Sequence, residues 1–329
     1  MLCVALVLGS VAVARADSMD LELSRLRVPP SKGGCPADGG FCPNDESFER
    51  LVSDLSVGIA PAVQSGAATL GLRGFSIALS MSITPISGRH WIQGSAGPDP
   101  TQAFNPEPDG ALAWNRLEVR KGLPFGLEIG GMLGHGVDTS MWVFSGELRA
   151  ALFEGYRSGL GALPDVAVRG VFQTLTGSEQ LSMQTWSFDV TLSKPFVAFG
   201  RHRLTPIVAL QALLVDASTR PVDLTPDTSA WDVCGAAAPD SDDPKLPATE
   251  TCGSAEAAQD LENTVTFADV HQTRIRAFLG LEEAYGPFSF AFTLGFDLTV
   301  PQRSADIADR VDSDLPRALT LHFVAGLRY

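Results

Sequence analysis

The sequence lacks, beyond its first residues, any apolar run long enough to form a membrane-spanning helix. Such a helix needs about 18–20 consecutive apolar residues. The best later candidate, LTPIVALQALLVDA at 204–217, is shorter and is interrupted by a proline and a glutamine. The start differs, because an apolar stretch over 2–13 is followed by Ala-Arg-Ala. This pattern predicts a secretory signal peptide over residues 1–16, although the usual positive n-region is missing. We expect an exported protein with no helical span.

The sequence also lacks an excess of basic residues and any clear cofactor or metal motif. Its net charge is −14, which argues against nucleic acid as a partner. No CxxC occurs and no histidine lies close to a cysteine in sequence, so no metal site and no cofactor are predicted. No G-x-S-x-G motif or other convergent catalytic set occurs either, and we expect no enzymatic activity.

Cysteine is scarce, with five in the chain, and one of them, Cys3, falls in the signal segment. An even number of cysteines in an exported chain predicts disulfide bonds. Pairing of nearest neighbours, Cys35 with Cys42 and Cys234 with Cys252, is one of three connectivities that four cysteines allow. The second pair brackets part of an acidic segment, 216–262, which carries eleven acidic residues and which we expect to be a solvated surface loop.

What the sequence does contain is a long series of alternating segments. In FSFAFTLGFDLT at 288–299, four phenylalanines share one face while small and polar residues share the other. Segments of this kind recur, and most are ten residues or longer, which suits tilted membrane strands better than the strands of soluble sheets. The pattern predicts ten strands, with twelve as the alternative, at about 74–84, 112–121, 125–135, 141–154, 165–176, 181–193, 204–217, 264–283, 287–300 and 317–329.

The connections between these segments alternate in length. Long polar connections at 85–111, 218–263 and 301–316 contrast with tight turns such as GLP and YGP, although 155–164 and 194–203 are longer than ideal turns. Long loops at one end and short turns at the other are typical of outer-membrane barrels. We therefore predict an all-β, antiparallel, up-and-down transmembrane β-barrel over 66–329, preceded by an N-terminal extension or plug over 17–65 with one short helix.

Aromatic residues are expected to form two girdles at the two membrane interfaces. The long-loop end would carry Trp91, Trp114 and Trp142. The short-turn end would carry Phe125, Phe153, Tyr156, Phe196, Phe199, Tyr285, Phe288 and Tyr329.

The polar faces of the strands are then expected to line the lumen with a nearly balanced set of charges. An interior filled by salt bridges and a narrow polar pore both fit such a set. The first strand offers only small inward residues, which leaves space for the 17–65 segment. The predicted lumen-lining residues are Arg116, Glu118, Arg120, Glu128, Glu147, Arg149, Arg169, Asp189, Arg274, Arg276 and Glu282.

These segments also carry a resemblance. From LRGFSIALSMSITP through RLEVRKGLPFGLEIGGMLGH to the terminal LHFVAGLRY, the chain resembles uncharacterised outer-membrane β-barrel proteins of Gram-negative bacteria. It also looks distantly like the long-chain fatty-acid transporters, which place an N-terminal plug before the barrel. The resemblance implies export through the periplasm to the outer membrane. It also implies recognition of the aromatic final strand by the barrel-insertion machinery.

Function is predicted to be passive: a narrow porin-like channel or transporter, or a structural surface protein, with outer-membrane lipid as its surroundings and an unknown solute. One alternative is a rim-site hydrolase like the omptins, because Asp269 and His271, or His135 and Asp138, lie near the predicted mouth. A second alternative is a soluble secreted β-sandwich.

Overall fold

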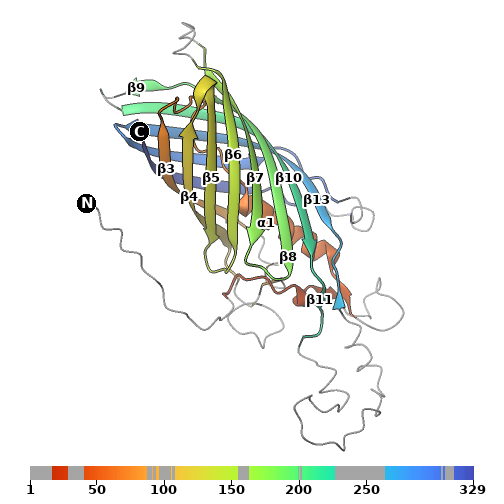
Figure 1. Ribbon diagram of the computed structural model, residues 1–329. Helices are drawn as coiled ribbons and strands as arrows, with labels where there is room; N and C mark the ends of the chain where they lie inside the picture. The colour runs from red at the N-terminus through yellow and green to blue at the C-terminus, as the bar shows by residue number, and fades with distance from the viewer. Residues whose placement is uncertain are drawn as a thin grey trace, which may run out of the picture.

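The computed structural model describes residues 17–28, 41–86, 91, 94–95, 105, 108–154, 163–198, 200, 202–226, 264–304, 307 and 315–329. Ten long antiparallel strands form one sheet that closes on itself (Figure 1). Closure is made where β10 pairs with β13 and where the last strand, β15, pairs with the first, β3. The ten strands are β3 (Phe75–Pro85), β4 (Ala111–Gly122), β5 (Leu127–Gly136), β6 (Trp142–Phe153), β7 (Asp165–Thr176), β8 (Leu181–Ser193), β10 (His202–Thr219), β13 (Val270–Tyr285), β14 (Phe288–Asp297) and β15 (Leu319–Arg328).

One closed antiparallel sheet confirms the predicted barrel class and the predicted number of ten strands. It excludes the β-sandwich alternative, because a sandwich packs two separate sheets face to face. The structure differs locally from the predicted strand ranges at the ends of β10 and β13. The strand β13 begins at Val270, and the preceding Thr264–Val265 forms β12, which pairs with β11 (Val222–Asp223). At the opposite end, β9 (Phe196–Ala198) pairs with the first residues of β10, which accounts for the long connection there.

The pleat of each strand separates an apolar outer face from an inner face. On β3, Ile77 and Leu79 are exposed, while Ser76, Ser80 and Ser82 are buried. The same alternation recurs around the wall: the outer face carries large apolar side chains, and the inner face carries polar and small side chains together with buried apolar ones near the long-loop end. The predicted two-faced strands thus form one continuous apolar exterior.

The aromatic prediction was partly wrong. Phe125, Phe196, Tyr285 and Phe288 are exposed at the short-turn end, in agreement with a girdle there. Trp142 is exposed at the long-loop end. The other two tryptophans expected there, Trp91 and Trp114, are buried in the interior and belong to no outer girdle. Trp114 lies on the inward face of β4 with Arg116, because the two residues are two positions apart in a strand whose side chains alternate between its faces. Phe153 and Tyr329 are exposed as well, and the last two residues of that prediction, Tyr156 and Phe199, lie outside the described residues.

The N-terminal segment enters the long-loop end of the barrel before β3 begins. It contains a 3-10 turn, η1 (Leu23–Arg25), and a two-residue pairing of β1 (Arg27–Val28) with β2 (Cys42–Pro43), followed by α1 (Asp45–Ile59). From α1 the chain crosses to the short-turn end and continues into β3 (Figure 1). A second 3-10 turn, η3 (Pro124–Gly126), joins β4 to β5. Among the described helices, none has the length and apolar character required to cross a membrane.

Candidate functional site: the filled barrel interior

The interior at the long-loop end is an apolar core built around α1. Phe48, Leu51, Leu55 and Ile59 of the helix are buried. They pack in one cluster with inward residues from the long-loop ends of the strands and with residues of the flanking loops. Those partners include Trp91, Leu112, Trp114, Met141, Val143, Leu175, Met183, Leu213, Val215, Val270 and Ile307. The sequence analysis expected a polar interior throughout, and that expectation was wrong for this half of the barrel.

Both ends of α1 are fixed by hydrogen bonds. Asn44 caps the N-terminus, where its side chain accepts a hydrogen bond from the Ser47 N–H. The last turn of the helix carries no basic residue of its own. The barrel wall supplies one instead, because Arg116 Nη2 donates to the Gly58 carbonyl at 2.7 Å. A cation at a helix C-terminus stabilises the free carbonyls and the negative end of the helix dipole.

After α1, the chain is held in the lumen through its backbone carbonyls. The donors are long side chains of the wall: Gln173 donates to Ile59 O at 2.8 Å, Gln211 to Pro61 O at 2.9 Å and Arg169 to Ala62 O at 2.9 Å. Arg149 donates to Gly66 O. The bonded residues Pro61, Ala62 and Gly66 have small side chains, so the wall recognises the path of the backbone itself.

The backbone amides further along are held by acceptors of the wall. Gly66 N–H donates to Glu282 Oε2 at 2.8 Å, and Ala67 N–H donates to Ser193 Oγ at 2.6 Å. Thr69 N–H donates to Glu154 Oε1 at 2.8 Å, and Leu70 N–H donates to Glu128 Oε1. Four backbone N–H groups of residues 66–70 therefore donate hydrogen bonds to side chains of the barrel. These bonds fix this stretch at the short-turn end.

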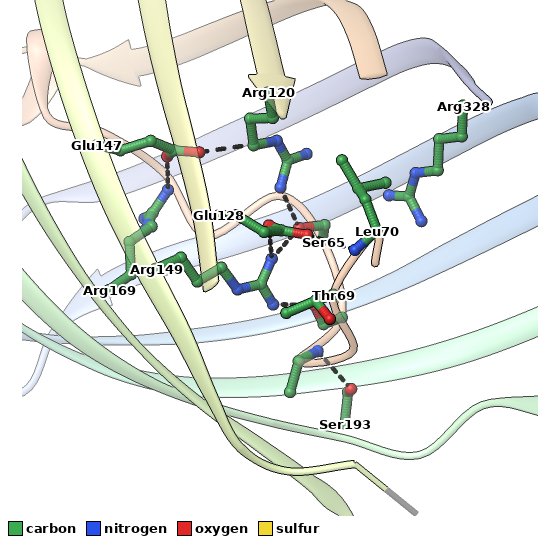
Figure 2. A network of polar contacts seen from close by, with 12 residues as sticks. Ser65, Thr69, Leu70, Arg120, Glu128, Glu147, Arg149, Arg169, Ser193 and Arg328 are labelled. Carbon is green, nitrogen blue, oxygen red and sulfur yellow. Dashed lines mark hydrogen bonds and ion pairs between the residues drawn. The ribbon is translucent and has the colours of Figure 1, made fainter. Parts of the chain in front are cut away.

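The charged side chains around this stretch form one connected network (Figure 2). Arg169 contacts Glu147 at 3.3 Å and Asp189 at 2.8 Å, and Arg120 lies 3.8 Å from Glu147. Arg149 lies 3.6 Å from Glu128. Ser65 of the N-terminal segment joins these pairs, because its hydroxyl oxygen accepts from Arg120 at 2.7 Å and from Arg149 at 2.9 Å.

A second group of charges lies between this network and the apolar core. Arg274 is bonded to Asp297 and donates to Ser53 O of α1 at 3.1 Å. Arg276 Nε lies 3.5 Å from Asp297 Oδ1, and Arg276 Nη2 donates to Thr320 Oγ1 at 3.1 Å. His322, on β15, is buried in the same region, 6.0 Å from Phe278 between ring centroids.

All the predicted lumen-lining residues have inward positions. By the alternation of their strands, these are Arg116, Glu118, Arg120, Glu128, Glu147, Arg149, Arg169, Asp189, Arg274, Arg276 and Glu282, each of them buried or half-buried. In the structure, ten of them form ion pairs or contact the N-terminal segment. Glu118 accepts instead from Ser80 on the neighbouring strand, at 2.7 Å.

Several interior residues were missed, among them four titratable ones. Asp297, His322 and Arg328 lie on inward faces of β14 and β15, and Glu154 follows β6 at the short-turn end. Asp297 pairs with two arginines, and Arg328 pairs with Glu282. The first three stand at the polar positions of their strands, so the alternation alone was the signal that could have found them.

The long-loop side of α1 is tied to the loop after β14 through Glu49. Its carboxylate lies 3.1 Å from Arg303 Nε and accepts a hydrogen bond from Ser304 N–H at 3.2 Å. Burial raises the pKa of Glu49, and this effect outweighs the opposing effects of Arg303 and Ser304.

The voids inside the filled barrel beside Gln64 of the N-terminal segment are small. Two voids beside Gln64 have volumes of about 10 Å³ each, enough for roughly one water molecule. A larger cavity of about 240 Å³ opens at the short-turn end, between Thr69, Leu70, Arg203, Glu282 and Tyr329.

The residues of the hydrolase alternative do not converge in the described part of the chain. His271 Nδ1 lies 2.7 Å from Asp216 Oδ1, on the exposed outer wall, and not against Asp269. His135 packs against Trp142 in a tilted arrangement, with ring centroids 4.4 Å apart. No group of three or more potential metal ligands occurs among the described residues.

Cys42 is disulfide-bonded. The pairings predicted for Cys35, Cys42, Cys234 and Cys252 stay predictions, because the other three cysteines lie outside the described residues, as do the signal segment 1–16 and most of the acidic loop.

No family model and no curated protein matches the chain. Among solved structures it is similar to Ail, the attachment invasion locus protein of Yersinia pestis, with 10% identity and a TM-score of 0.26, over 78% of this chain and 99% of Ail. It is also similar to Neisserial surface protein A, with 7% identity and a TM-score of 0.25, over 81% of this chain and 98% of that protein. At such values neither likeness carries an argument, so the strand pairing and the interior contacts define the molecule as a filled, closed β-barrel.

Proposed function

We propose that this chain is an outer-membrane β-barrel that its own N-terminal segment keeps closed, and that it acts as a structural surface protein. The observation that carries the proposal is the filling of the lumen. An apolar core around α1 occupies one half, and backbone contacts from Ile59 to Leu70 occupy the other.

The apolar exterior supports a membrane location. The strands are 10 to 18 residues long, and a tilted strand needs about 9–11 residues to cross a bilayer. Exposed apolar patches on water-soluble monomers rarely exceed a few hundred Å². Here large apolar side chains are exposed on nine of the ten strands. Transfer of such a surface into lipid would be favoured by about 25 cal/mol for each Å² buried.

The predicted signal peptide and the final strand support the outer membrane in particular. The strand β15 ends the described chain with alternating residues such as Phe323 and with an exposed Tyr329. In the proposed orientation, the short turns face the periplasm and the long loops face the exterior, as in bacterial outer-membrane barrels. The acidic 216–262 loop would then be displayed on the cell surface.

The membrane part of the proposal is tested by heat-modifiable migration and by cell fractionation. The folded protein is expected in the outer-membrane fraction and should migrate differently in SDS gels before and after boiling. Identical migration, together with recovery in the soluble periplasmic fraction, would overturn this part of the proposal.

The closed lumen is tested by conductance in planar bilayers. The full chain is expected to give no lasting single-channel steps, because voids of about 10 Å³ admit no hydrated ion. A variant lacking residues 17–60 should conduct if it inserts, since it loses α1. Large and stable conductance of the full chain would overturn the closed state. Conductance equally absent in an inserted deletion variant would show that the segment is not what closes the lumen.

A transporter that opens by moving the segment is the second candidate. The observation that favours it is the cavity of about 240 Å³ at the short-turn end, which reaches the segment at Gly66 and Leu70. Brief, voltage-dependent openings of the full chain would favour this function over the structural one. Such openings should disappear when a cross-link joins the segment to the wall.

A further inference from the structure

Positive charge accumulates in one region of the barrel interior. We define the cationic cluster as Arg116 on β4, Arg274 and Arg276 on β13, and His322 on β15. Each of the four side chains is at most 2% exposed. Asp297 is the carboxylate with which the arginines of this cluster form ion pairs among the described residues.

Asp297 is mainly engaged by one arginine. Its Oδ2 accepts from Arg274 Nη1 and from the Ala318 N–H, the latter at 2.9 Å. Its Oδ1 has only a longer contact, 3.5 Å, with Arg276 Nε. Arg274 completes its bonding on Ser53 of α1. Arg274 and Asp297 therefore largely neutralise each other's charge, and the charge of Arg276 is only partly neutralised.

Arg116 has no ion pair in the described part of the chain. Its Nη2 donates to Gly58 O, while Nε and Nη1 have no hydrogen-bond partner there. Arg276 Nη1 also has none. The C-terminus of α1 contributes only a partial negative charge near Arg116. A buried cation without a full counter-charge is strongly unfavourable, and buried N–H groups without an acceptor add to that cost.

His322 lies in the field of these two arginines. Neither of its ring nitrogens has a hydrogen-bond partner among the described residues. A neutral imidazole carries one N–H donor, so it can bond an anion without adding charge. On β15 it pairs with Ser82 of β3 and Thr293 of β14, whose hydroxyl is also buried and unbonded.

The strand between Arg116 and His322 carries short polar side chains. β3 presents only Ser80, Ser82 and Thr84 inward at this level, and its neighbours in register place Arg116 on one side and His322 on the other. N–H and O–H groups of three adjacent strands therefore face the interior at one level.

We propose that the cationic cluster binds a small inorganic anion of halide size, held by Arg116, Arg276 and His322. The anion supplies the counter-charge that Asp297 does not provide. Its place beside Gly58 means that it also stabilises the docking of the end of α1. The proposal does not depend on the membrane location or on the closed lumen.

The test compares chloride with gluconate, an anion too large for the site, at equal ionic strength. The refolded full chain should lose its folded gel band at a temperature about 2–4 °C higher in chloride. In Arg116→Met this difference should vanish. The matched control is Arg120→Met, which removes an arginine from the same face of β4 but leaves the cluster intact, and which should keep the chloride effect.

A crystal of the full chain grown in sodium bromide gives a second, independent measurement. An anomalous peak within hydrogen-bond distance of the Arg116 and Arg276 guanidinium groups is expected. Water in that place, an equal midpoint in chloride and gluconate, or a chloride effect that persists in Arg116→Met would overturn the proposal. Should Arg116→Met fail to fold, the bromide peak in the unaltered chain decides the matter.

Discussion

Arg169 joins three separate parts of the interior. It contacts Glu147 of β6 and Asp189 of β8, and it also donates to the Ala62 carbonyl of the N-terminal segment. One residue thus couples two strands to the chain that fills the lumen. The same pattern, in which long wall side chains bond a backbone of small residues, holds for Arg149 and Gln211.

The first prediction concerns this residue. Arg169→Met should lower the free energy of unfolding by about 3–5 kcal/mol, because it leaves the buried Asp189 without its cation and Glu147 with Arg120 alone. Denaturant unfolding in lipid vesicles, followed by tryptophan fluorescence, measures the change. The control is Glu283→Gln, whose partner His202 lies 2.6 Å away in a half-exposed pair, and it should cost less than about 1 kcal/mol. A cost of that small size for Arg169→Met would refute the structural role assigned here.

At the scale of residues, the sequence predicts well which face of a strand a side chain occupies, but it predicts poorly which other side chain it contacts. A period of two fixes which face a residue occupies, so the inward positions of Arg120 and Glu147 could be predicted. Which carboxylate meets which arginine depends on register and on the segment in the lumen, and neither is encoded in the alternation. For Trp114, the usual preference of tryptophan for interfaces suggested the exterior, but its inward parity prevailed.

At the scale of elements, α1 differs from an ordinary surface helix. Twelve of its fifteen residues are buried, among them Glu49, Ser53 and Asp54. A helix with polar residues buried on several sides needs partners in all directions, and the inside of a barrel provides them. The sequence predicted a short helix in a segment that could fill the lumen, but not the apolar partners of this helix. Its apolar partners are dispersed as one or two residues at the long-loop ends of many strands.

The second prediction concerns the docking of this helix. Leu55→Asp should release α1 from the lumen, because a carboxylate in the apolar core has no counter-charge there. Emission from the buried Trp91 and Trp114 should shift to the red, and stepwise conductance should appear in planar bilayers. The folded band in unboiled SDS gels should persist.

The matched control for the helix is Glu46→Gln, a substitution at a partly exposed position of α1. It should change neither the emission nor the conductance. Should Leu55→Asp keep the emission of the unaltered chain, the packing of α1 against these tryptophans would be contradicted.

At the scale of the whole molecule, the barrel has an apolar exterior and buried charges in its interior, the reverse of the arrangement in water-soluble proteins. Each strand contributes to both, so the arrangement depends on every strand keeping its register with its neighbours. The barrel class, the strand number and the alternation of loop lengths could be predicted because they repeat along the chain. The apolar half of the interior could not, because it arises only when distant strand ends meet around α1.

The third prediction concerns the proposed membrane belt. Leu79→Arg, in the middle of the outer face of β3, should destabilise the barrel in lipid vesicles by about 2–4 kcal/mol. Val197→Arg, on β9 at the short-turn end, should cost only about 0–1 kcal/mol. The two residues are 66% and 72% exposed, so exposure alone does not separate them. Equal costs in a denaturant titration would contradict the position of the belt.

The connection from α1 to β3 restricts the order in which the molecule can assemble. The chain leaves α1 at one end of the barrel and becomes a wall strand only after it reaches the other end. A barrel that had already closed would have to admit the helix lengthwise through the lumen. We therefore expect the strands to close around a helix that already lies between them, and the seam between β3 and β15 to form last. On this expectation, the N-terminal segment is the core on which the barrel is assembled.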